Sequence, residues 1–389
     1  MSKPKCRICR STDLVEVLHY ARAPRNIERL LETDELARDG AVELRAARCG
    51  NCGHVQLPVQ LQVDYYEDYL MSHSHAKKMQ EFQRTQAAGF LEHFALKGGR
   101  VFEAGCGDGQ FSVTLREIGC EVLANEPSAK ARGACEARGL ETIAGYVTRG
   151  AFGELHGTFD AVVARQVLEH VPDPNDFLQE LRSLLKPGGA GLIEVPSLEQ
   201  ALENERFFDF FPDHLSYFSA TTLAHVCTRN MFEVVQVRRA MDGEYNEAWI
   251  RRTEAPDLEA IRLAAGAIAG AFGAFLSAEA ARSRKVAIWG AGAKGVLTLA
   301  MVDAASVAYL IDSDPVKHGR YTPVSHLEVL PPQKLAESPV NTVIITALAY
   351  RDEISRDLRE RYGFAGKIAC LSGGAIIELE PDSPGLTRR

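Results

Sequence analysis

The sequence has no run of about eighteen consecutive apolar residues, which is the length that a membrane-spanning helix requires. Its first ten residues, MSKPKCRICR, also lack the apolar stretch at the centre of a secretory signal peptide. These two absences argue against a membrane anchor and against export. We therefore expect a cytoplasmic protein with no membrane partner.

An excess of positive charge is missing as well. The chain has 44 lysines and arginines against 52 aspartates and glutamates, so its formal net charge is −8. This balance gives no overall basic field to hold a polyanion, which disfavours nucleic acid as the main partner. Hydrophobic residues at 46% and charged residues at 25% are typical of folded globular proteins. Because 389 residues exceed what one core usually serves, we expect two or three domains.

The nine cysteines favour metal ligands and buried thiols over a disulfide framework, since the chain is long and carries no export signal. Cys6 with Cys9 and Cys49 with Cys52 form two CxxC knuckles, which together supply the four sulfurs of a tetrahedral zinc site. Thiolates fill all four positions, so this zinc is expected to be structural. Four free thiols or a redox pair are the alternatives. The remaining cysteines are expected to be buried, namely Cys106, Cys120, Cys135, Cys227 and Cys370.

The middle of the chain alternates short β-rich runs with amphipathic stretches, which is typical of a doubly wound α/β sheet. The last of the expected helices stops at the sequence Lys-Pro-Gly-Gly of residues 186–189. The expected strands cover residues 100–103, 121–125, 160–164, 191–195 and 233–237, and the expected helices cover residues 80–95, 111–118 and 175–185.

The first expected strand leads into a glycine-rich turn, where the backbone can approach a ligand closely. Glu103, two residues before the first glycine, suits a cofactor that bears an ammonium group. Glu126, at the end of the second strand, suits the hydroxyls of a ribose. The GxGxG turn alone is a weak signal. The expected cofactor-binding residues of these two segments are Glu103, Gly105, Gly107, Gly109, Glu126 and Pro127.

A later segment, FDAVVARQVLEHV over residues 159–171, makes the pattern more specific. With the glycine-rich turn and the Lys-Pro-Gly-Gly turn, it closely resembles the class I methyltransferases that use S-adenosylmethionine (SAM). The resemblance implies a doubly wound sheet that binds SAM, with Arg165 and Gln166 among the cofactor contacts and Gln166 near the methionine or adenine portion. A relative of the same fold that has lost its cofactor is the alternative.

A dense aromatic segment, RFFDFFPDHLSYF, occupies residues 206–218. In open α/β sheets, ligands lie beyond the carboxyl ends of the strands, so a segment of this kind is well placed to cover a substrate. Core packing is the alternative for its phenylalanines. We expect Asp213 and His214 to be functional instead of a pair that fixes a loop, and Phe211 and Tyr217 to contact the substrate.

A second α/β unit follows an alanine-rich helical stretch at residues 258–281. It begins with KVAIWGAGAKG over residues 285–295, and its second strand ends at Asp312, which together form a plausible nicotinamide-nucleotide fingerprint. We expect a Rossmann-like domain that binds a nucleotide. Lys294, Lys317 and Arg320 are its expected substrate-binding residues.

The whole order of parts resembles the sugar C-methyltransferases of bacterial deoxysugar pathways. The segments that carry the resemblance are the cysteine region with CGNCGHVQL, the methyltransferase core and the GAGAKG unit that ends in KHGRYTP. It implies a zinc-binding domain at residues 1–74, a SAM-dependent domain at 75–245, a helical linker at 246–284 and a substrate-binding domain at 285–389. The implied substrate is a nucleotide-linked 4-keto-deoxysugar, methylated at the carbon beside the ketone.

The same resemblance assigns catalytic roles, and chemistry supports them. A proton beside a ketone is removable when the enolate is stabilised, and a histidine does this well near neutral pH. His214 matches the proposed base of the family's YxEH segment, and His170 matches the imidazole of its VLAHIxD segment. Phe211 and Asp213 depart from the family's tyrosine and glutamate. Asp213 is expected to bind a sugar hydroxyl or to orient an imidazole, and the hydrogen bond to the enolate is expected from His170 or from Tyr65, Tyr66 or Tyr69.

Three other functions fit parts of the sequence. Methyl transfer to oxygen or nitrogen is the first, because the changes at Phe211 and Asp213 could follow a changed acceptor. A nucleotide-dependent oxidoreductase that uses the second unit is another, although no separate catalytic domain follows that unit. A zinc-bearing interaction module fits least, since it would not need the cofactor motif.

Overall fold

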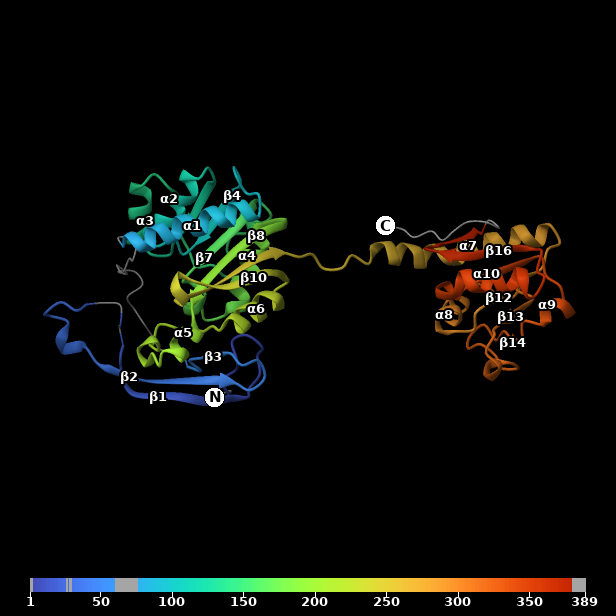
Figure 1. Ribbon diagram of the computed structural model, residues 1–389, viewed down its shortest axis with the longest axis horizontal. Coiled ribbons are helices and arrows are strands. Elements are labelled where there is room, and N and C mark those ends of the chain that lie inside the picture. The colour runs from blue at the N-terminus through green and yellow to red at the C-terminus, as the bar shows by residue number, and fades with distance from the viewer. Residues whose placement is uncertain (1–2, 26, 28–29, 60–75, 380–389) are drawn as a thin grey trace. The chain divides into compact units, whose positions relative to one another are not determined.

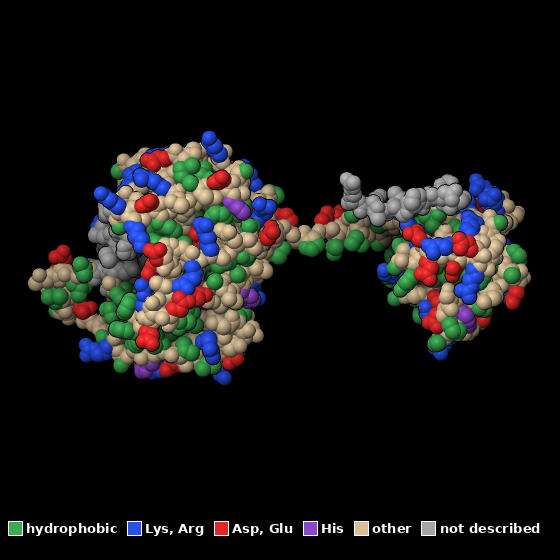
Figure 2. Space-filling view, viewed as in Figure 1, with side chains coloured by type: hydrophobic (Ala, Val, Ile, Leu, Met, Phe, Trp, Pro, Cys, Tyr) green, Lys and Arg blue, Asp and Glu red, His purple; other side chains and the backbone are tan. Residues whose placement is uncertain are grey.

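A computed structural model describes residues 3–25, 27, 30–59 and 76–379 (Figure 1). The chain forms two compact units, Met1–Ala255 and Pro256–Arg389. On the face drawn in Figure 2, acidic and basic side chains are interspersed over both units. The expected tyrosines Tyr65, Tyr66 and Tyr69, and the expected boundary at residue 74, lie outside the described residues.

The cysteine region forms a small antiparallel sheet of four strands in the order β1-β2-β3-β9. The last of these strands comes from the aromatic segment, far away in the sequence. Leu57 N–H also donates to the Leu215 carbonyl at 3.0 Å, just before this strand. The cysteine region therefore supports the segment that carries Asp213 and His214. The strands are Leu14–Pro24 (β1), Ala41–Cys49 (β2), Val55–Gln56 (β3) and Ser216–Tyr217 (β9), with a 3-10 turn at Leu36–Arg38 (η1).

The second sheet has seven strands in the order β10-β11-β8-β7-β4-β5-β6. All neighbours are parallel except at β11, which runs antiparallel to β8 and β10. This order confirms the expected class I methyltransferase sheet, with its switch point between β4 and β7. Its strands are Arg100–Ala104 (β4), Glu121–Asn125 (β5), Glu141–Ile143 (β6), Phe159–Arg165 (β7), Leu185–Pro196 (β8), Phe232–Ala240 (β10) and Tyr245–Arg252 (β11).

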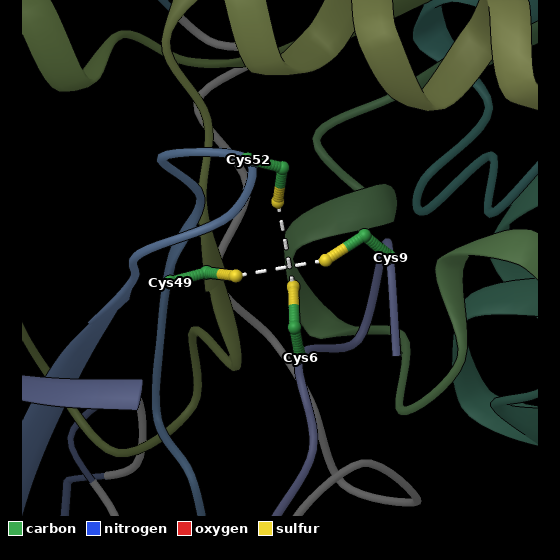
Figure 3. Close-up of side chains that lie close together, drawn as sticks. All are labelled: Cys6, Cys9, Cys49 and Cys52. Atoms are coloured by element: carbon green, nitrogen blue, oxygen red, sulfur yellow. Dashed lines mark hydrogen bonds between the residues drawn. The ribbon is translucent and has the colours of Figure 1, made fainter. Parts of the chain in front are cut away.

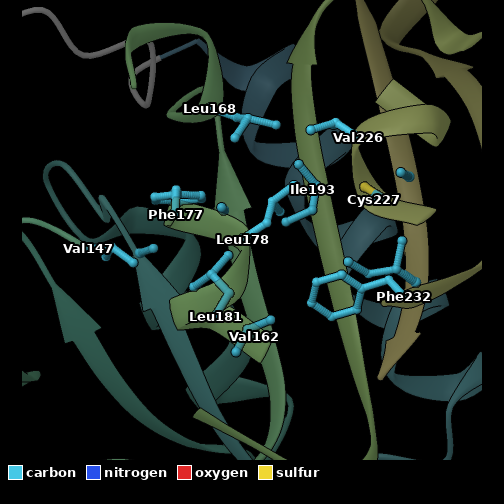
Figure 4. Packing of buried hydrophobic residues seen from close by; sticks show 14 of the residues in the cluster. Val147, Val162, Leu168, Phe177, Leu178, Leu181, Ile193, Val226, Cys227 and Phe232 are labelled. Atoms are coloured by element: carbon cyan, nitrogen blue, oxygen red, sulfur yellow. The ribbon is translucent and has the colours of Figure 1, made fainter. Parts of the chain in front are cut away.

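Helices cover both faces of this sheet. Neighbouring strand residues point to opposite faces, so Val162 packs with helix α4 and Val163 packs with helix α1. Figure 4 shows the α4 face, where Leu178 and Leu181 lie beside Ile193 of β8. The helices are Lys77–His93 (α1), Gln110–Glu117 (α2), Ala129–Ala137 (α3), Pro174–Leu184 (α4), Leu198–Glu203 (α5) and Ala220–Arg229 (α6), with 3-10 turns at Gly153–Leu155 (η3), Leu168–His170 (η4), Phe207–Asp209 (η5) and Met241–Gly243 (η6).

Local chemistry explains the bounds of α4. The Asp173 side chain accepts hydrogen bonds from the backbone N–H groups of Asn175 and Asp176, and Pro174 occupies the first turn. The helix ends at Leu184, close to the expected position. The Lys-Pro-Gly-Gly sequence lies within the bounds of β8, so this strand begins six residues before the expected one.

The C-terminal unit has a sheet of six strands in the order β14-β13-β12-β15-β16-β17, parallel except for β17. This confirms the expected Rossmann-like fold. Its strands are Val286–Trp289 (β12), Tyr309–Ile311 (β13), Val329–Leu330 (β14), Thr342–Ile345 (β15), Lys367–Ser372 (β16) and Ala375–Glu378 (β17), and its helices and 3-10 turns are Glu259–Ala281 (α7), Ala293–Met301 (α8), Lys334–Glu337 (α9), Arg351–Glu360 (α10), Pro315–Lys317 (η7) and Leu348–Tyr350 (η8).

Residues 246–284 do not form the expected helical linker. Strand β11 pairs with β8 and β10 inside the methyltransferase sheet, and α7 belongs to the C-terminal unit, where Phe272 and Leu276 pack on Val286 and Ile288. The connection between the units therefore falls near Ala255. Helix α7 is long and apolar enough to cross a membrane by length and composition alone, so the expected absence of a membrane partner stays a prediction.

Candidate methyl-transfer site

The glycine-rich turn joins β4 to α2 at the switch point of the sheet. Gly105, Gly107 and Gly109 all have positive φ angles, of 65°, 56° and 77°. A Cβ on Gly105 would lie 2.5 Å from a methyl group of Val167, and a Cβ on Gly109 would lie 2.6 Å from Leu140. A Cβ on Gly107 would meet nothing within 4 Å. Gly105 and Gly109 are thus required by packing and conformation, whereas Gly107 leaves open space beside the turn.

Glu103 and Glu126, the two expected acidic contacts, lie at the ends of adjacent parallel strands. Burial raises the pKa of Glu103 to about 7, and the hydroxyl of Ser112 donates a hydrogen bond to its carboxyl group. Glu126 accepts hydrogen bonds from the N–H groups of Gly107 at 3.0 Å and Ser128 at 2.9 Å. Each carboxylate oxygen has a second lone pair, so Glu126 retains acceptor capacity for a ribose hydroxyl. Pro127 directs its carbonyl to the guanidinium of Arg132.

Arg165 and Gln166, at the end of β7, both contact Glu194 of β8. The distances to Glu194 Oε1 are 2.9 Å from Arg165 Nη2 and 3.2 Å from Gln166 Nε2. The Arg165 guanidinium also lies over the ring of Phe111. The side chain of Gln86 from α1 donates to the other oxygen of Glu194 at 2.5 Å. Arg165 is therefore engaged by the protein, in addition to any role toward a cofactor.

Sequence reasoning missed Glu194 and its partners. Gln86 also donates to Glu247 of β11 at 2.8 Å, and both glutamates are fully buried. The available signal was an acid inside each apolar run, in GLIEVP and NEAWI. Buried carboxylates of this kind require partners, so they predict a polar network inside the core.

His170, Asp213 and His214, which were expected to act together, do lie together. Leu215 N–H donates to the Glu169 carbonyl at 2.8 Å, and this bond holds turn η4 beside residues 213–215. His170 Nδ1 lies 3.2 Å from both the backbone oxygen and the Oδ2 atom of Asp213. The rings of His170 and His214 are edge to face, with their centroids 4.8 Å apart.

The environment of His214 is apolar on one side. Its ring lies 4.0 Å from the ring of Phe211, and the residue is 8% exposed. Burial, and then the nearby charge of His170, hold the pKa of His214 well below its usual value. The imidazole is consequently neutral near pH 7, which is the form that can accept a proton or bind a metal ion.

The aromatic segment divides between core and surface. The Tyr217 hydroxyl donates to the Phe211 carbonyl at 3.0 Å and accepts from the Phe211 N–H at 3.1 Å, so Tyr217 braces the loop from a buried position. Phe207 and Phe208 are 69% and 61% exposed, which excludes core packing for these two residues.

The C-terminal unit has its own glycine-rich turn. Gly290 has a φ angle of 127°, and the Ala291 N–H donates to Asp312 Oδ2 at 2.8 Å. Lys317 Nζ lies 3.0 Å from the same oxygen, so Lys317 forms an ion pair within the protein. Lys294 and Arg320 are exposed. Of the three expected substrate contacts in this unit, Lys317 is paired with Asp312, and Lys294 and Arg320 are exposed to solvent.

Two regions of the chain match known protein families. Residues 79–237 match a methyltransferase domain, and residues 252–371 match the C-terminal domain of C-methyltransferases. The chain belongs to the C-methyltransferase family with a SAM-type core. The methyltransferase match contains all of the expected cofactor residues and the pair His170 and His214.

Two relatives differ in sequence identity and in the length that they share with this member of the C-methyltransferase family. The C-methyltransferase NovU of Streptomyces niveus is 28% identical over 241 residues, which are 61% of this chain and 57% of NovU. The ubiquinone biosynthesis O-methyltransferase of Xanthomonas oryzae pv. oryzae is 35% identical over 99 residues, 24% of this chain and 41% of that protein. The chain thus spans little more than half the length of NovU.

Two solved methyltransferase structures are similar to part of the chain. The 1,6-didemethyltoxoflavin-N1-methyltransferase of Burkholderia thailandensis, with bound S-adenosylhomocysteine, is 17% identical with a TM-score of 0.37, covering 53% of this chain and 98% of that one. A putative methyltransferase of Haloferax volcanii in complex with the Trm112 activator is 15% identical with a TM-score of 0.40, covering 46% of this chain and 94% of that one.

The four cysteines of the two knuckles lie before both matched regions and converge in space (Figure 3). Sγ atoms of Cys6 and Cys52 are 3.6 Å apart, as are those of Cys9 and Cys49. Two sulfurs bound to one zinc ion at about 2.3 Å would lie about 3.8 Å apart in a tetrahedron. The donor set and its spacing therefore fit zinc. The five other cysteines are buried, as expected.

The first cysteine knuckle also contacts the loop that follows His170. The Arg7 guanidinium donates to the Pro172 carbonyl at 2.6 Å, and the Asn175 side chain donates to the carbonyls of Arg7 and Ile8 at 2.8 and 3.1 Å. The knuckle is thus joined to this loop by side-chain donors on both sides, each of which binds a backbone carbonyl of the other.

Proposed function

We propose that the protein transfers the methyl group of SAM to the carbon beside the ketone of a nucleotide-linked keto-deoxysugar in the cytoplasm. The observation that carries this proposal is the order of two family domains, a methyltransferase core followed by a C-methyltransferase C-terminal domain. The name of NovU, which shares 28% identity, supports a carbon acceptor. The sugar nucleotide rests on the resemblance of the sequence to deoxysugar enzymes.

SAM supplies an electrophilic methyl group when it is bound. The protein must make the acceptor carbon nucleophilic, which requires removal of a proton beside the ketone and stabilisation of the resulting negative oxygen. His170, Asp213 and His214 are the described residues that we assign to the acceptor. They lie after β7 and next to β9, at the edge of the sheet where α/β proteins bind ligands.

The turn around Gly105 and Gly107 is the assigned position of SAM. An ionised Glu103 would pair with its ammonium group, and Glu126 would accept from its ribose hydroxyls. In the C-terminal unit, the turn at Gly290 and the exposed Lys294 at the start of α8 are assigned to the nucleotide of the acceptor. The four cysteines are assigned to a structural zinc ion.

Methyl transfer to oxygen is the second candidate. A ubiquinone biosynthesis O-methyltransferase is 35% identical to the chain over 99 residues, and this identity favours an oxygen acceptor. Phe211 and Asp213, which depart from the sugar-enzyme pattern, are also compatible with a different acceptor.

A panel of nucleotide-linked 4-keto sugars, incubated with the full-length protein and SAM carrying a ¹³C-labelled methyl group, tests the proposal. The expected product carries the label on carbon, which the methyl chemical shift and its coupling to the ring carbons identify by NMR. A label on oxygen would favour the second candidate. S-adenosylhomocysteine formed with quinol or phenol acceptors, but with no keto sugar, would overturn the proposal.

A further inference from the structure

Tyr245, which sequence reasoning did not single out, lies at the end of the sheet that carries the candidate site. Strand β11 begins at Tyr245, which pairs with Pro196, the last residue of β8. Strand β8 runs parallel to β7, whose last residue is Arg165, so Tyr245 lies at the carboxyl end of these two strands. Open α/β sheets bind their ligands at this end. The position of Tyr245 is therefore that of a ligand contact.

The side chain of Tyr245 points to the face of the sheet that helix α1 covers. Alternate residues of a strand share one face, and residues four apart share one face of a helix. Three pairs join β11 to α1 at these spacings, namely Tyr245 with Phe82 (ring centroids 6.2 Å apart), Glu247 with Gln86 (2.8 Å from Oε2 to Nε2) and Trp249 with Phe90 (ring centroids 5.9 Å apart). The contacts with α1 thus fix the direction of the tyrosine ring.

The hydroxyl of Tyr245 is available to a ligand. The side chain is partly buried, and no described residue is hydrogen bonded to its hydroxyl. Buried tyrosine hydroxyls usually have a partner. Burial, and then the charge of Glu194, raise the pKa of Tyr245 to about 12, so the hydroxyl is protonated near neutral pH. Tyr245 therefore offers one O–H donor at the carboxyl end of the sheet.

Tyr217, the tyrosine of the aromatic segment, differs in this respect. Its hydroxyl already donates to the Phe211 carbonyl and accepts from the Phe211 N–H. Phe211 itself has no hydroxyl. Tyr217 therefore braces its loop, whereas the hydroxyl of Tyr245 can donate to a bound molecule.

The backbone next to Tyr245 is fastened to the aromatic segment. The guanidinium of Arg206, the first residue of that segment, donates to both carboxylate oxygens of Glu244 at 2.7 and 2.8 Å. The charge of Glu169, which precedes His170 in turn η4, also acts on Tyr245. Tyr245 therefore belongs to the surroundings of the two segments that carry the proposed catalytic histidines.

We propose that Tyr245 is a further catalytic residue, whose hydroxyl donates a hydrogen bond to the ketone oxygen of the acceptor. The assignment rests on the proposed function, because it takes the acceptor to be a ketone. When a base removes the proton beside the ketone, negative charge moves to this oxygen, and the hydrogen bond becomes stronger. Tyr245 keeps its own proton throughout. It adds a donor from β11 to those expected from His170 or from Tyr65, Tyr66 or Tyr69.

Tyr245→Phe removes the hydroxyl and keeps the ring that contacts Phe82. With a nucleotide-linked 4-keto sugar and SAM, turnover should fall by about tenfold or more, because a donor to the developing negative oxygen is lost. The affinity of the keto sugar for protein loaded with S-adenosylhomocysteine, measured by calorimetry, should fall only about threefold, since a neutral ketone accepts a weaker hydrogen bond than an enolate. The affinity for SAM should not change.

A pH profile separates donation by the hydroxyl from support of the fold. Replacement of Tyr245 with a fluorinated tyrosine preserves the hydroxyl and makes it ionise at lower pH. Because only the protonated hydroxyl donates, turnover of this protein should decline at a lower pH than turnover of the unaltered protein. A purely structural tyrosine would not move the profile.

Tyr362→Phe is the matched control. Tyr362 is also partly buried and lies against an aromatic ring, that of Trp289 at 5.7 Å between centroids, and no described residue is hydrogen bonded to its hydroxyl. It lies in the C-terminal unit, before the amino end of β16. Its replacement should leave turnover and both affinities unchanged.

Two results would overturn the role of Tyr245. The first is Tyr245→Phe that methylates the keto sugar at the unaltered rate. The second is a fluorinated protein whose pH profile equals that of the unaltered protein. Either result would leave the methyl-transfer proposal standing, because that proposal is judged by the labelled product. Conversely, a keto sugar that binds less tightly to Tyr245→Phe but receives the label on oxygen would sink transfer to carbon and leave Tyr245 as an acceptor contact.

Discussion

The raised pKa of the single residue Glu103 predicts that cofactor binding depends on pH. Burial raises this pKa to about 7, so the carboxyl group is partly protonated near neutrality and ionised above it. An ammonium group would bind the ionised form. We therefore expect the affinity for SAM, measured by calorimetry, to rise between pH 6 and pH 8 and to level off above that range.

The control for this prediction is Glu103→Gln, which keeps the size of the side chain and removes its charge. Its affinity should be lower by about tenfold at pH 8, from the loss of one charge-assisted hydrogen bond, and should not vary over the same pH range. A pH profile that is identical in the two proteins would contradict the role of Glu103. Without cofactor, the raised pKa has the opposite effect, since it lowers folding stability as pH increases from about 4.5 to 7.

Gly105 offers a test of the turn itself. Gly105→Val places a branched side chain at a positive φ angle and against Val167, so SAM binding should become undetectable by calorimetry. Gly98→Val is the matched control, because Gly98 has a φ angle of 79° with open space around it. Undiminished SAM affinity in Gly105→Val would remove the turn from the cofactor site.

His214→Ala distinguishes action on the acceptor from support of the fold. We expect SAM affinity to stay nearly constant while turnover falls by roughly 10²-fold or more, because a group that acts on the acceptor is lost. Exchange of the acceptor's carbon-bound proton with deuterated solvent should slow as well, provided that the unaltered protein shows it. His225→Ala is the control. Exchange that continues at the original rate would exclude His214 from proton removal and from enolate stabilisation.

The sequence patterns of individual strands and turns explain why most of the fold was predictable. The parallel strands β4, β5 and β7 each contain a short apolar run that is flanked by charged residues and followed closely by a turn, which is a pattern that strand prediction detects. The glycine-rich turn was predictable for a different reason. Its glycines adopt positive φ angles, which other residues rarely do. Strand β11 was not recognised, because its buried residues include Glu247, whose charge is compensated by Arg238 and Gln86 from distant segments.

The candidate site was only partly predictable. His170, Asp213 and His214 stand out as polar residues in apolar or aromatic surroundings. The partners of Arg165 and the burial of Glu169 depend on tertiary contacts that have no local signal. Glu169 precedes a residue that was identified by resemblance, and only the structure shows that Glu169 is buried.

The cysteine region and the aromatic segment form one sheet, because β3 pairs with β9. Cys49→Ser should release zinc and destabilise strands β2 and β3, because the four thiolates are coupled to the folding of this region. Zinc content by mass spectrometry and hydrogen exchange over residues 41–57 and 213–218 would report the change. Cys120→Ser, at a buried cysteine outside the cluster, is the control. Well-folded protein that contains no zinc would contradict the assignment.

The two units of the molecule share one hydrogen-bonded arrangement at their glycine-rich turns. In both, an acid at the end of the second strand accepts a hydrogen bond from the glycine-rich turn, Glu126 from Gly107 and Asp312 from Ala291. The strand orders β6-β5-β4-β7-β8 and β14-β13-β12-β15-β16 are also equivalent. Each unit therefore has the framework of a nucleotide-binding fold, and the proposed catalytic residues His170 and His214 belong to the first.

We expect the full-length protein to bind sugar nucleotides more tightly than nicotinamide nucleotides in titration calorimetry, because we propose that the second unit binds the acceptor. Lys294→Ala should weaken sugar-nucleotide binding by about tenfold through the loss of a charged contact to phosphate. Lys334→Ala, which removes another lysine of the same unit, should not. Micromolar affinity for a nicotinamide nucleotide, with none for sugar nucleotides, would reverse this assignment.

The pairing of β3 with β9 has a thermodynamic consequence. Because strand β9 of the aromatic segment pairs with β3 of the cysteine region, we expect zinc occupancy and acceptor affinity to be linked through the folding of one sheet. Linkage is reciprocal, so an acceptor that binds more tightly to the zinc-loaded protein must increase the zinc affinity by the same factor, which a competing chelator would report at equilibrium. The ion would then act as an effector of the acceptor site without taking part in any bond that changes.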